Sequence, residues 1–250
     1  MSAPASLVVR RWRAQTAFEA RMILRNGEQL LVTIAFPLLL LVGLTVTDVV
    51  SLDTEGARRI DVVAPGVLAM AIMTTAFTSQ AIATAFDRRN GVLRLMATTP
   101  LGRGGLLAGK IAGVFAVEAV QIVLLVAVAL GLGWHPTAAG IAPALLAWVL
   151  GTSAFTALAM LLAGTLRAEA VLAVANLVLA VLVVGGGVIA PAHQLPGPLT
   201  QVALLLPSGA LGEAMRGAFQ HGSVPPFSVL VLLLWTAALG WGINRLFRWQ

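Results

Sequence analysis

The chain has 250 residues, of which 59% are hydrophobic and 10% are charged, and its formal net charge is +6. Soluble domains usually carry about 25% charged residues, so these charges are too few to cover a water-exposed body of this size. The composition excludes a soluble enzyme or binding domain and predicts an all-α integral membrane protein.

Residues 1–29 are predicted to form a cytoplasmic N-terminus with an amphipathic helix in the membrane interface. At helical pitch, arginines fall on one side and most apolar residues on the other. The alternative is a soluble amphipathic helix docked on protein, but an apolar run follows at once. Because that run begins near residue 30, after the charged stretch, we expect no cleaved signal peptide. The arginines of the polar side are Arg10, Arg13, Arg21 and Arg25.

Six apolar runs follow, and they predict a six-helix transmembrane domain over residues 30–250. Each run meets or exceeds the roughly 20 residues that cross a hydrocarbon core of about 30 Å. The runs cover residues 30–50, 62–86, 106–134, 141–166, 168–189 and 227–247.

The basic residues give the domain an orientation. If the N-terminus is cytoplasmic, all but three of the 16 basic residues fall in cytoplasmic segments, and the exceptions are Arg58, Arg59 and Arg216. The positive-inside rule favours this arrangement, which places both termini in the cytoplasm. The basic excess therefore needs no nucleic-acid partner. Arginine far outnumbers the single lysine, Lys110, which suggests a bacterial, high-GC source and hence the inner membrane.

Two connections are long enough to have a function. One is the cytoplasmic loop over residues 87–105. The other, over residues 190–226, is external and mixes Pro and Gly with apolar residues. This stretch is too apolar for a free loop and too interrupted for a span. It predicts short re-entrant helices in the outer leaflet before the last span.

The sequence offers no nucleotide site. Residues 104–110 read G-x-x-x-x-G-K, but Ile111 stands where a phosphate loop needs Ser or Thr to hold Mg²⁺. No buried strand is expected before this stretch, and it leads into an apolar run. We therefore expect no cofactor in this chain. ATP and Mg²⁺ would bind a separate subunit.

Chemistry inside the membrane has few candidates. Glu118 is the clearly embedded acid, and Gln80, Gln121 and Asn176 could line a translocation path with it. The alternative is that these side chains hold neighbouring helices together. The sequence has no cysteine, no paired acids, no nucleophile with a base and no histidine cluster. This argues against a membrane enzyme and against a metal site.

Residues 91–98 of the cytoplasmic loop predict a short helix. Asn90 is a good N-cap, and Pro100 disfavours helix at the residue before it. The helix presents Val92, Leu93, Leu95 and Met96 beside arginines. A short apolar and basic helix between two spans suits docking into a groove on a partner. The alternative is an interfacial helix that contacts only lipid.

The cytoplasmic loop and the residues after it contain a recognisable combination: Asp87-Arg88, Gly91, Leu93, Leu95, Thr99-Pro100-Leu101 and Gly109-Lys110. With these residues the loop resembles that of the transmembrane subunits of type 2 ATP-binding cassette exporters. The external stretch from Pro207 to Arg216 is also similar to the segment before the last span of that family. Asp87 replaces the usual Glu, and Arg94 stands where an acid is common.

The resemblance implies a permease that pairs with itself or a sister subunit and with two cytoplasmic ATP-binding subunits. It implies ATP-driven export, and the apolar helices favour a hydrophobic or amphiphilic cargo such as a drug, an antibiotic or a lipid. The alternative is an ion-coupled secondary transporter that works without an ATPase. The implied coupling residues are Asp87, Arg88, Arg89, Gly91, Leu93, Arg94, Leu95 and Pro100, and the external motif includes Pro207, Glu213 and Arg216.

Overall fold

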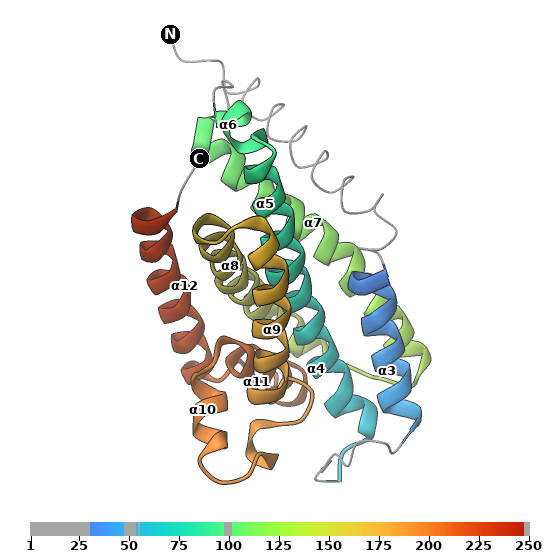
Figure 1. Ribbon diagram of the computed structural model, residues 1–250. Helices are drawn as coiled ribbons and strands as arrows, with labels where there is room; N and C mark the ends of the chain where they lie inside the picture. The colour runs from blue at the N-terminus through green and yellow to red at the C-terminus, as the bar shows by residue number, and fades with distance from the viewer. Residues whose placement is uncertain (1–30, 48–53, 55, 98–101, 248–250) are drawn as a thin grey trace.

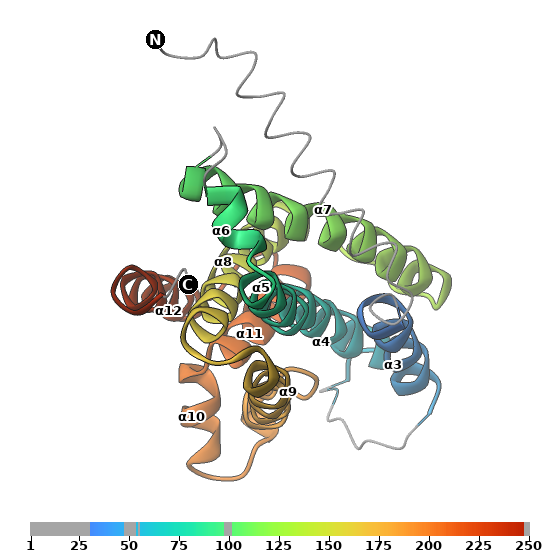
Figure 2. The same ribbon diagram turned by 45° about the horizontal axis from the view of Figure 1, so that its top comes forward.

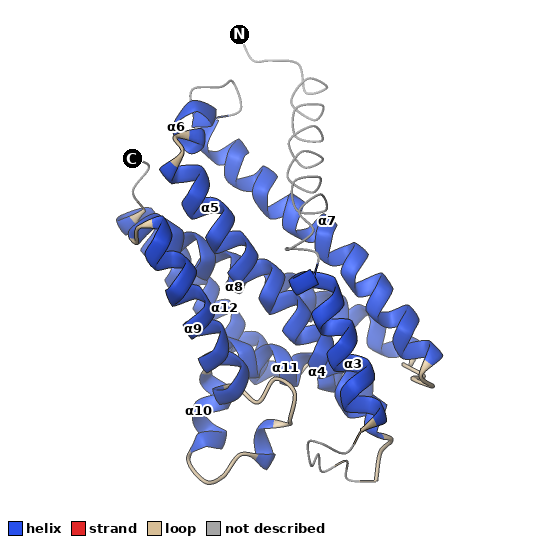
Figure 3. Cartoon of the chain, turned by 45° about the vertical axis from the view of Figure 1, so that its right-hand side comes forward, coloured by secondary structure: helices blue, strands red, loops and turns tan. Residues whose placement is uncertain are grey.

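The computed structural model describes residues 31–47, 54, 56–97 and 102–247, and the regular structure in this part is helical throughout (Figure 3). The predicted interfacial helix of residues 1–29 lies outside the described residues. The main helices are α3 (Phe36–Val46), α4 (Arg59–Met73), α5 (Gln80–Arg89), α6 (Val92–Ala97), α7 (Gly102–Gly131), α8 (Ile141–Thr165), α9 (Ala168–Gly185), α10 (Leu199–Leu205), α11 (Pro207–His221) and α12 (Pro226–Leu246).

Five helical segments of the described part are long and apolar enough to cross a membrane. They match five of the six predicted runs: Arg59–Arg89, Ala108–Gly131, Ala138–Thr165, Ala168–Gly185 and Pro226–Leu246. The first predicted run corresponds to a shorter apolar helix, Thr33–Val46, which is made of the later part of a π-helical turn, η1 (Leu31–Ala35), and of α3. The described part of this helix is shorter than a span requires. The six-span layout therefore stays a prediction.

One long helical segment forms the centre of the bundle. It joins α4, the π-helical stretch η2 (Thr74–Ser79) and α5 without interruption, and α3, α7, α8 and α9 surround it in Figure 2. Its core side chains, such as Met73, Ala76 and Phe77, are fully buried. The outer helices instead expose large apolar side chains, among them Val123 of α7 and Val184 of α9. Such outward faces suit a lipid environment.

The segment predicted as re-entrant helices contains a short 3-10 helix, η4 (Ala192–Gln194), and two α-helices, α10 and α11. The helices α10 and α11 lie at the end of the bundle opposite α6 (Figure 1). We call these two ends the α6 end and the α10 end. Helix α11 begins at Pro207, which suits a first helical position because that position needs no N–H donor. It packs between α4, α8 and α12 and is mostly buried.

A proline in α4 creates a contact with α11. Pro65 lies inside the helix and has no N–H for the carbonyl of Asp61, four residues earlier. The amide of Gln220, near the end of α11, donates to this carbonyl at 3.3 Å. The backbone group that proline leaves without a helical partner is thus satisfied by a neighbouring element.

The turn between α5 and α6 differs from the prediction. The predicted helix at residues 91–98 appears as α6, Val92–Ala97. Asn90, however, is the C-cap of α5 and not the N-cap of α6. Gly91 has φ +73°, and its carbonyl accepts the backbone N–H of Leu95, so Gly91 makes the turn and starts α6. Glycine adopts this left-handed backbone without the steric cost that a Cβ imposes.

Candidate functional site

The last turn of α5 is fastened to the start of α7 by an ion pair. Lys110 Nζ lies 2.7 Å from Asp87 Oδ2, and the Lys110 side chain is 1% exposed while that of Asp87 is 20% exposed. Lys110 lies within the continuous helix α7 and not in a loop of the phosphate-binding type. Sequence reasoning missed this pair, although both residues belong to the stretches that carried the family resemblance.

Two arginines tie the same turn to α8 and α9. The guanidinium of Arg88 donates to the carbonyl of Leu166, which caps the end of α8. Arg89 pairs with Glu169 in the first turn of α9 at 2.6 Å, and both side chains are exposed. The end of α5 therefore contacts three neighbouring spans, and the chain continues from it directly into α6.

Helix α6 turns its two described leucines in opposite directions. Leu93 is 2% exposed and packs inward, whereas Leu95 is 71% exposed. The predicted docking residues therefore divide into one that anchors α6 on the bundle and one that faces outward. Arg94 belongs to α6, but its side chain lies outside the described part of the structure, as does Pro100. The coupling role of Arg94 and Pro100 therefore stays a prediction.

The structure brings Glu118 and Gln121 together on the buried face of α7. Trp148 Nε1 and Thr152 Oγ1, both on α8, donate to Glu118 Oε2 at 2.6 and 2.7 Å. The Gln121 amide accepts from Thr75 Oγ1 at 3.0 Å and donates to the carbonyl of Thr33. These partners were missed in the sequence, because a helical period does not show which neighbouring helix faces a given residue.

The other two predicted path residues lie elsewhere. Gln80 is buried in the first turn of α5, and its amide donates to Thr84 Oγ1 at 3.4 Å. Asn176 lies on the exposed face of α9, where its amide donates to the carbonyl of Leu172 at 2.9 Å. The structure thus groups Glu118 with Gln121 but leaves Asn176 on an outer surface. An outer face of α9 can meet lipid or another protein chain.

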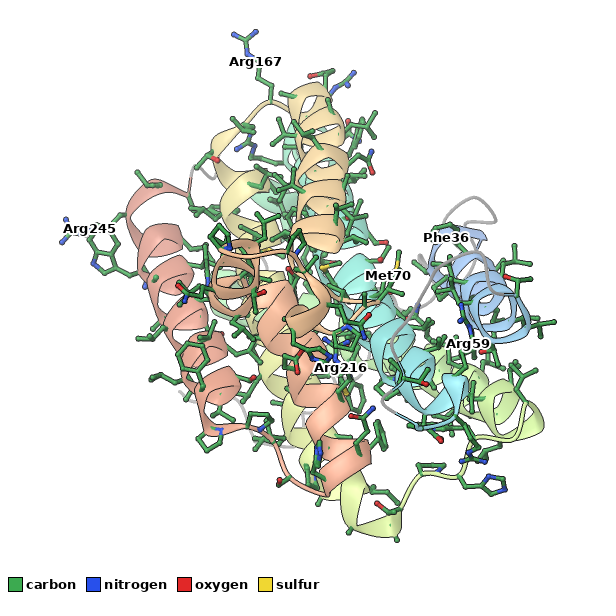
Figure 4. The ribbon with its side chains drawn as sticks, turned by 90° about the horizontal axis from the view of Figure 1, so that it is seen from below. Phe36, Arg59, Met70, Arg167, Arg216 and Arg245 are labelled. Carbon is green, nitrogen blue, oxygen red and sulfur yellow. The ribbon has the colours of Figure 1, made fainter. Side chains whose placement is uncertain are left out.

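At the α10 end, Arg216 is 3% exposed and lies in the interior of the bundle, whereas Arg167 and Arg245, both at the α6 end, project outward (Figure 4). Its guanidinium donates to the carbonyls of Val188 and Gly187 at 2.9 and 3.0 Å. These carbonyls belong to the turn after α9. One buried side chain of α11 therefore holds a loop that precedes it in the sequence.

Glu213 completes this arrangement one helical turn before Arg216. Its Oε1 accepts from Arg216 at 2.8 Å and from the backbone N–H of Ala192 at 3.1 Å. Burial alone would raise the pKa of Glu213, but the charge and hydrogen bond of Arg216, with the Ala192 N–H and nearby His193, hold the pKa below its ordinary value. The carboxyl group is therefore ionised at neutral pH, and the pair clamps α11 to the α9 turn.

Comparison with known proteins places the chain in a family. The sequence model of the ABC-2 type transporter family matches residues 10–219, which is most of the chain. No match was found among curated proteins. The match includes α6, the ion-paired end of α5 and the Arg216 clamp. The chain is therefore a member of the ABC-2 type transporter family, a multi-pass transmembrane permease subunit of a type 2 ABC transporter.

Proposed function

We propose that this permease exports a hydrophobic or amphiphilic substrate, and that two separate ATP-binding subunits drive it by docking on α6. The observation that carries the proposal is the orientation of α6. Leu93 anchors the helix inward, and Leu95 is exposed. A single exposed leucine on a short helix suits insertion into an apolar groove on a partner.

The charges of the described residues support a cytoplasmic location for the α6 end. Basic residues gather there, as the positive-inside rule requires of cytoplasmic segments. The C-terminus would then be cytoplasmic, since α12 ends on the α6 side (Figure 1). For the N-terminus, which lies outside the described residues, a cytoplasmic location is proposed from its arginines alone, and the inner membrane of a bacterium is the expected location. The basic residues of this end are Arg88, Arg89, Arg94, Arg103, Lys110, Arg167 and Arg245, against Arg58, Arg59 and Arg216 at the α10 end.

The contacts of α5 suggest how movement of α6 reaches the bundle. A push on α6 passes through the Gly91 turn to the last turn of α5. From there Asp87 acts on α7, Arg88 on α8 and Arg89 on α9. Such coupling requires that the ATP-binding subunits bind two states of the bundle with different affinity. A second copy of this chain, or a sister permease, would complete the path.

Substrate class rests on the character of the helices. The spans are apolar, and Glu118 is the acid that lies deep within one of them. A path with so few charges favours a drug, an antibiotic or a lipid over a small ion or a sugar. ATP hydrolysis would occur in the partner subunits, because the G-x-x-x-x-G-K stretch lies in helix α7 and its lysine is paired with Asp87.

A matched pair of leucine substitutions tests the docking role. Leu95→Ser should weaken binding of the ATP-binding subunit, since loss of a central apolar anchor costs about 2 kcal/mol or more, roughly 30-fold in affinity. The control is Leu246→Ser in the last turn of α12, a leucine that is 56% exposed at the same end. The chain is co-expressed with the ATP-binding subunit of its own gene neighbourhood, and co-elution and ATP-dependent transport are measured.

The expected outcome is loss of co-elution and transport for Leu95→Ser, with membrane expression unchanged, and retention of both for Leu246→Ser. Equal behaviour of the two variants would contradict docking through α6. A solitary chain that transports on a proton or sodium gradient without ATP would overturn the proposal in favour of an ion-coupled carrier.

A further inference from the structure

Three polar atoms without a hydrogen-bond partner gather in one part of the membrane domain. In the described residues, five buried side-chain atoms have no such partner, and three of them belong to Thr78, Glu118 and Thr156. Thr78 lies on η2, Glu118 on α7 and Thr156 on α8, and these three elements pack against one another. Buried polar atoms are nearly always satisfied in proteins, so such a concentration requires an explanation.

The helix register places Thr78 at the level of Glu118. The segment from α4 to α5 and helix α7 run in opposite directions, because α6 connects them at one end. Thr75 bonds to Gln121, so these two residues lie at the same depth. Thr78 follows Thr75 by three residues, and Glu118 precedes Gln121 by three residues. Because the two helical segments are antiparallel, Thr78 and Glu118 also lie at the same depth. Three helical residues correspond to a rise of about 4.5 Å.

Helix α8 contributes the hydrogen-bond donors to the carboxyl group of Glu118. Trp148 and Thr152 donate to the Oε2 atom of Glu118, which leaves the Oε1 atom, also buried, as the one without a partner. Thr156 follows Thr152 by one helical turn on the same face of α8. Phe115 packs edge-on against Trp148, with ring centroids 5.5 Å apart. An aromatic pair thus lies beside the carboxyl group of Glu118, and the Glu118 side chain is fully buried.

Within the described part, no basic side chain faces this carboxyl group. The elements η1, α3, η2 and α8, which lie around α7, have no titratable residue in their sequences. Arg59 and Asp61 are in the first turn of α4, at the α10 end. Lys110 is eight residues from Glu118, about 12 Å along the helix, and is paired with Asp87. The remaining basic residues of α6 and α7 are Arg94 and Arg103, both still further along the chain from Glu118.

We propose that Glu118 is a proton-binding site: its carboxyl group is neutral in this state of the bundle, with the proton on the Oε1 atom. An ionised carboxylate without a countercharge is strongly disfavoured in a low-dielectric interior, so it takes a proton from water and gives it back when water returns. The neutral acid still accepts from Trp148 and Thr152 through Oε2. The proton makes Oε1 a hydrogen-bond donor, and the two hydroxyl groups without partners, those of Thr78 and Thr156, lie on the two elements that pack against α7 here.

Protonation of Glu118 would respond to a change in the contact between α7 and α8. The carboxyl group lies at the contact between α7 and α8, which is bridged by the bonds from Trp148 and Thr152. A state that admits water to this contact would hydrate Glu118 and release its proton. The π-helical stretch η2 beside it fits such a role, since π-helical segments often occur at functional positions in helices. The proposal stands apart from ATP-driven export, because it concerns the chain without its partners.

Infrared spectroscopy of the purified full chain in lipid nanodiscs tests the proton directly. A protonated carboxylic acid gives a carbonyl stretching band that shifts in heavy water. At neutral pH we expect this band in the native protein and its loss in Glu118→Gln, whose amide retains an acceptor and a donor. The control Glu213→Gln should keep the band, because Glu213 is ion-paired with Arg216. Absence of the band in the native protein, or its persistence in Glu118→Gln, would overturn the proposal.

A pH series of thermal unfolding gives a second, independent readout. If the fold binds the neutral acid, raising the pH should lower the unfolding midpoint, because ionisation of Glu118 becomes favourable only in the unfolded chain. Glu118→Gln should lose that part of the slope and keep the midpoint measured at low pH. Identical slopes in the two proteins would contradict the proposal. Neither measurement uses an ATP-binding subunit, so failure here and failure of the export proposal are separate results.

Discussion

At the α10 end of the bundle, helix α11 is held mainly by contacts to backbone atoms, whereas at the α6 end two of the three contacts of α5 are ion pairs between side chains, Asp87–Lys110 and Arg89–Glu169. Arg216 donates to two backbone carbonyls, and a Cβ atom added to Gly209 would lie 2.0 Å from the carbonyl oxygen of Ala203. At the α6 end, by contrast, both side chains of the Arg89–Glu169 ion pair are exposed to solvent. Leu95 on α6 is also exposed.

The two kinds of contact differ in how they yield to force. Exposed ion pairs contribute little free energy and can exchange partners by changes of rotamer. Backbone groups that touch one another cannot separate without moving a whole helix, because interiors are densely packed. The α6 end is therefore suited to receive a movement from a partner. The α10 end is suited to keep α11 fixed against its neighbours.

Arg216→Met should have the largest effect on stability. It leaves the carbonyls of Val188 and Gly187 and the carboxylate of Glu213 without their main donor. Removing one partner of a buried pair costs about 3–5 kcal/mol of unfolding free energy. The control is Arg58→Met, because Arg58 pairs with Asp61 over the same three-residue spacing and distance, 2.8 Å, but is 52% exposed. That change should cost less than about 1 kcal/mol.

Thermal unfolding in lipid nanodiscs measures both arginine variants. A similar loss in the two would show that burial does not distinguish these pairs, and the contrast between the α10 end and exposed ion pairs would fail. The purified fraction that remains monodisperse gives a second readout if Arg216→Met proves too unstable for a melting curve.

Asp87→Asn should have the next largest effect and tests whether the α6 end contains one firm contact. Lys110 is buried, so neutralising its partner weakens a charged hydrogen bond worth about 1.5–3 kcal/mol. The matched control is Glu169→Gln, which neutralises the acid of the exposed Arg89 pair and should change the unfolding midpoint little. If Glu169→Gln lowers the unfolding midpoint as much as Asp87→Asn does, the exposed and the buried ion pair contribute equally to stability, and the burial of Lys110 does not make its pair the firmer one.

Long apolar runs were enough to predict five spans, because length and composition decide whether a segment crosses a membrane. The short helix predicted over residues 91–98, from Asn90 and Pro100, appears as α6. Partners across helices were not predictable in the same way. Glu118 was identified as an embedded acid, but Trp148 and Thr152 depend on how α7 faces α8. Asn90 was misassigned as an N-cap, since its propensity was considered without the left-handed backbone that Gly91 supplies.

The role of Arg216 shows a further limit of sequence reasoning. Its charge marked it as an exception to the positive-inside pattern, and the resemblance placed it in an external motif. Its actual partners are two backbone carbonyls, which no residue type reveals. A buried arginine bound to a loop becomes visible only when the turn after α9 and the face of α11 are placed together.

Gly209→Ala tests the backbone contact of α11 with the smallest chemical change. An added Cβ would lie 2.0 Å from the oxygen and 2.8 Å from the carbon of the Ala203 carbonyl and 2.8 Å from the carbonyl oxygen of Gly186, so a helix must shift. Overpacking of this kind costs about 1–3 kcal/mol. Gly240→Ala on α12 is the control, because no atom lies within 4 Å of its added Cβ, and Ala favours helix over Gly by about 1 kcal/mol. We expect a lower unfolding midpoint for Gly209→Ala and an unchanged or higher one for Gly240→Ala. Equal midpoints would mean that α11 can move away from α10 at little cost, so the α10 end would be as deformable as the α6 end.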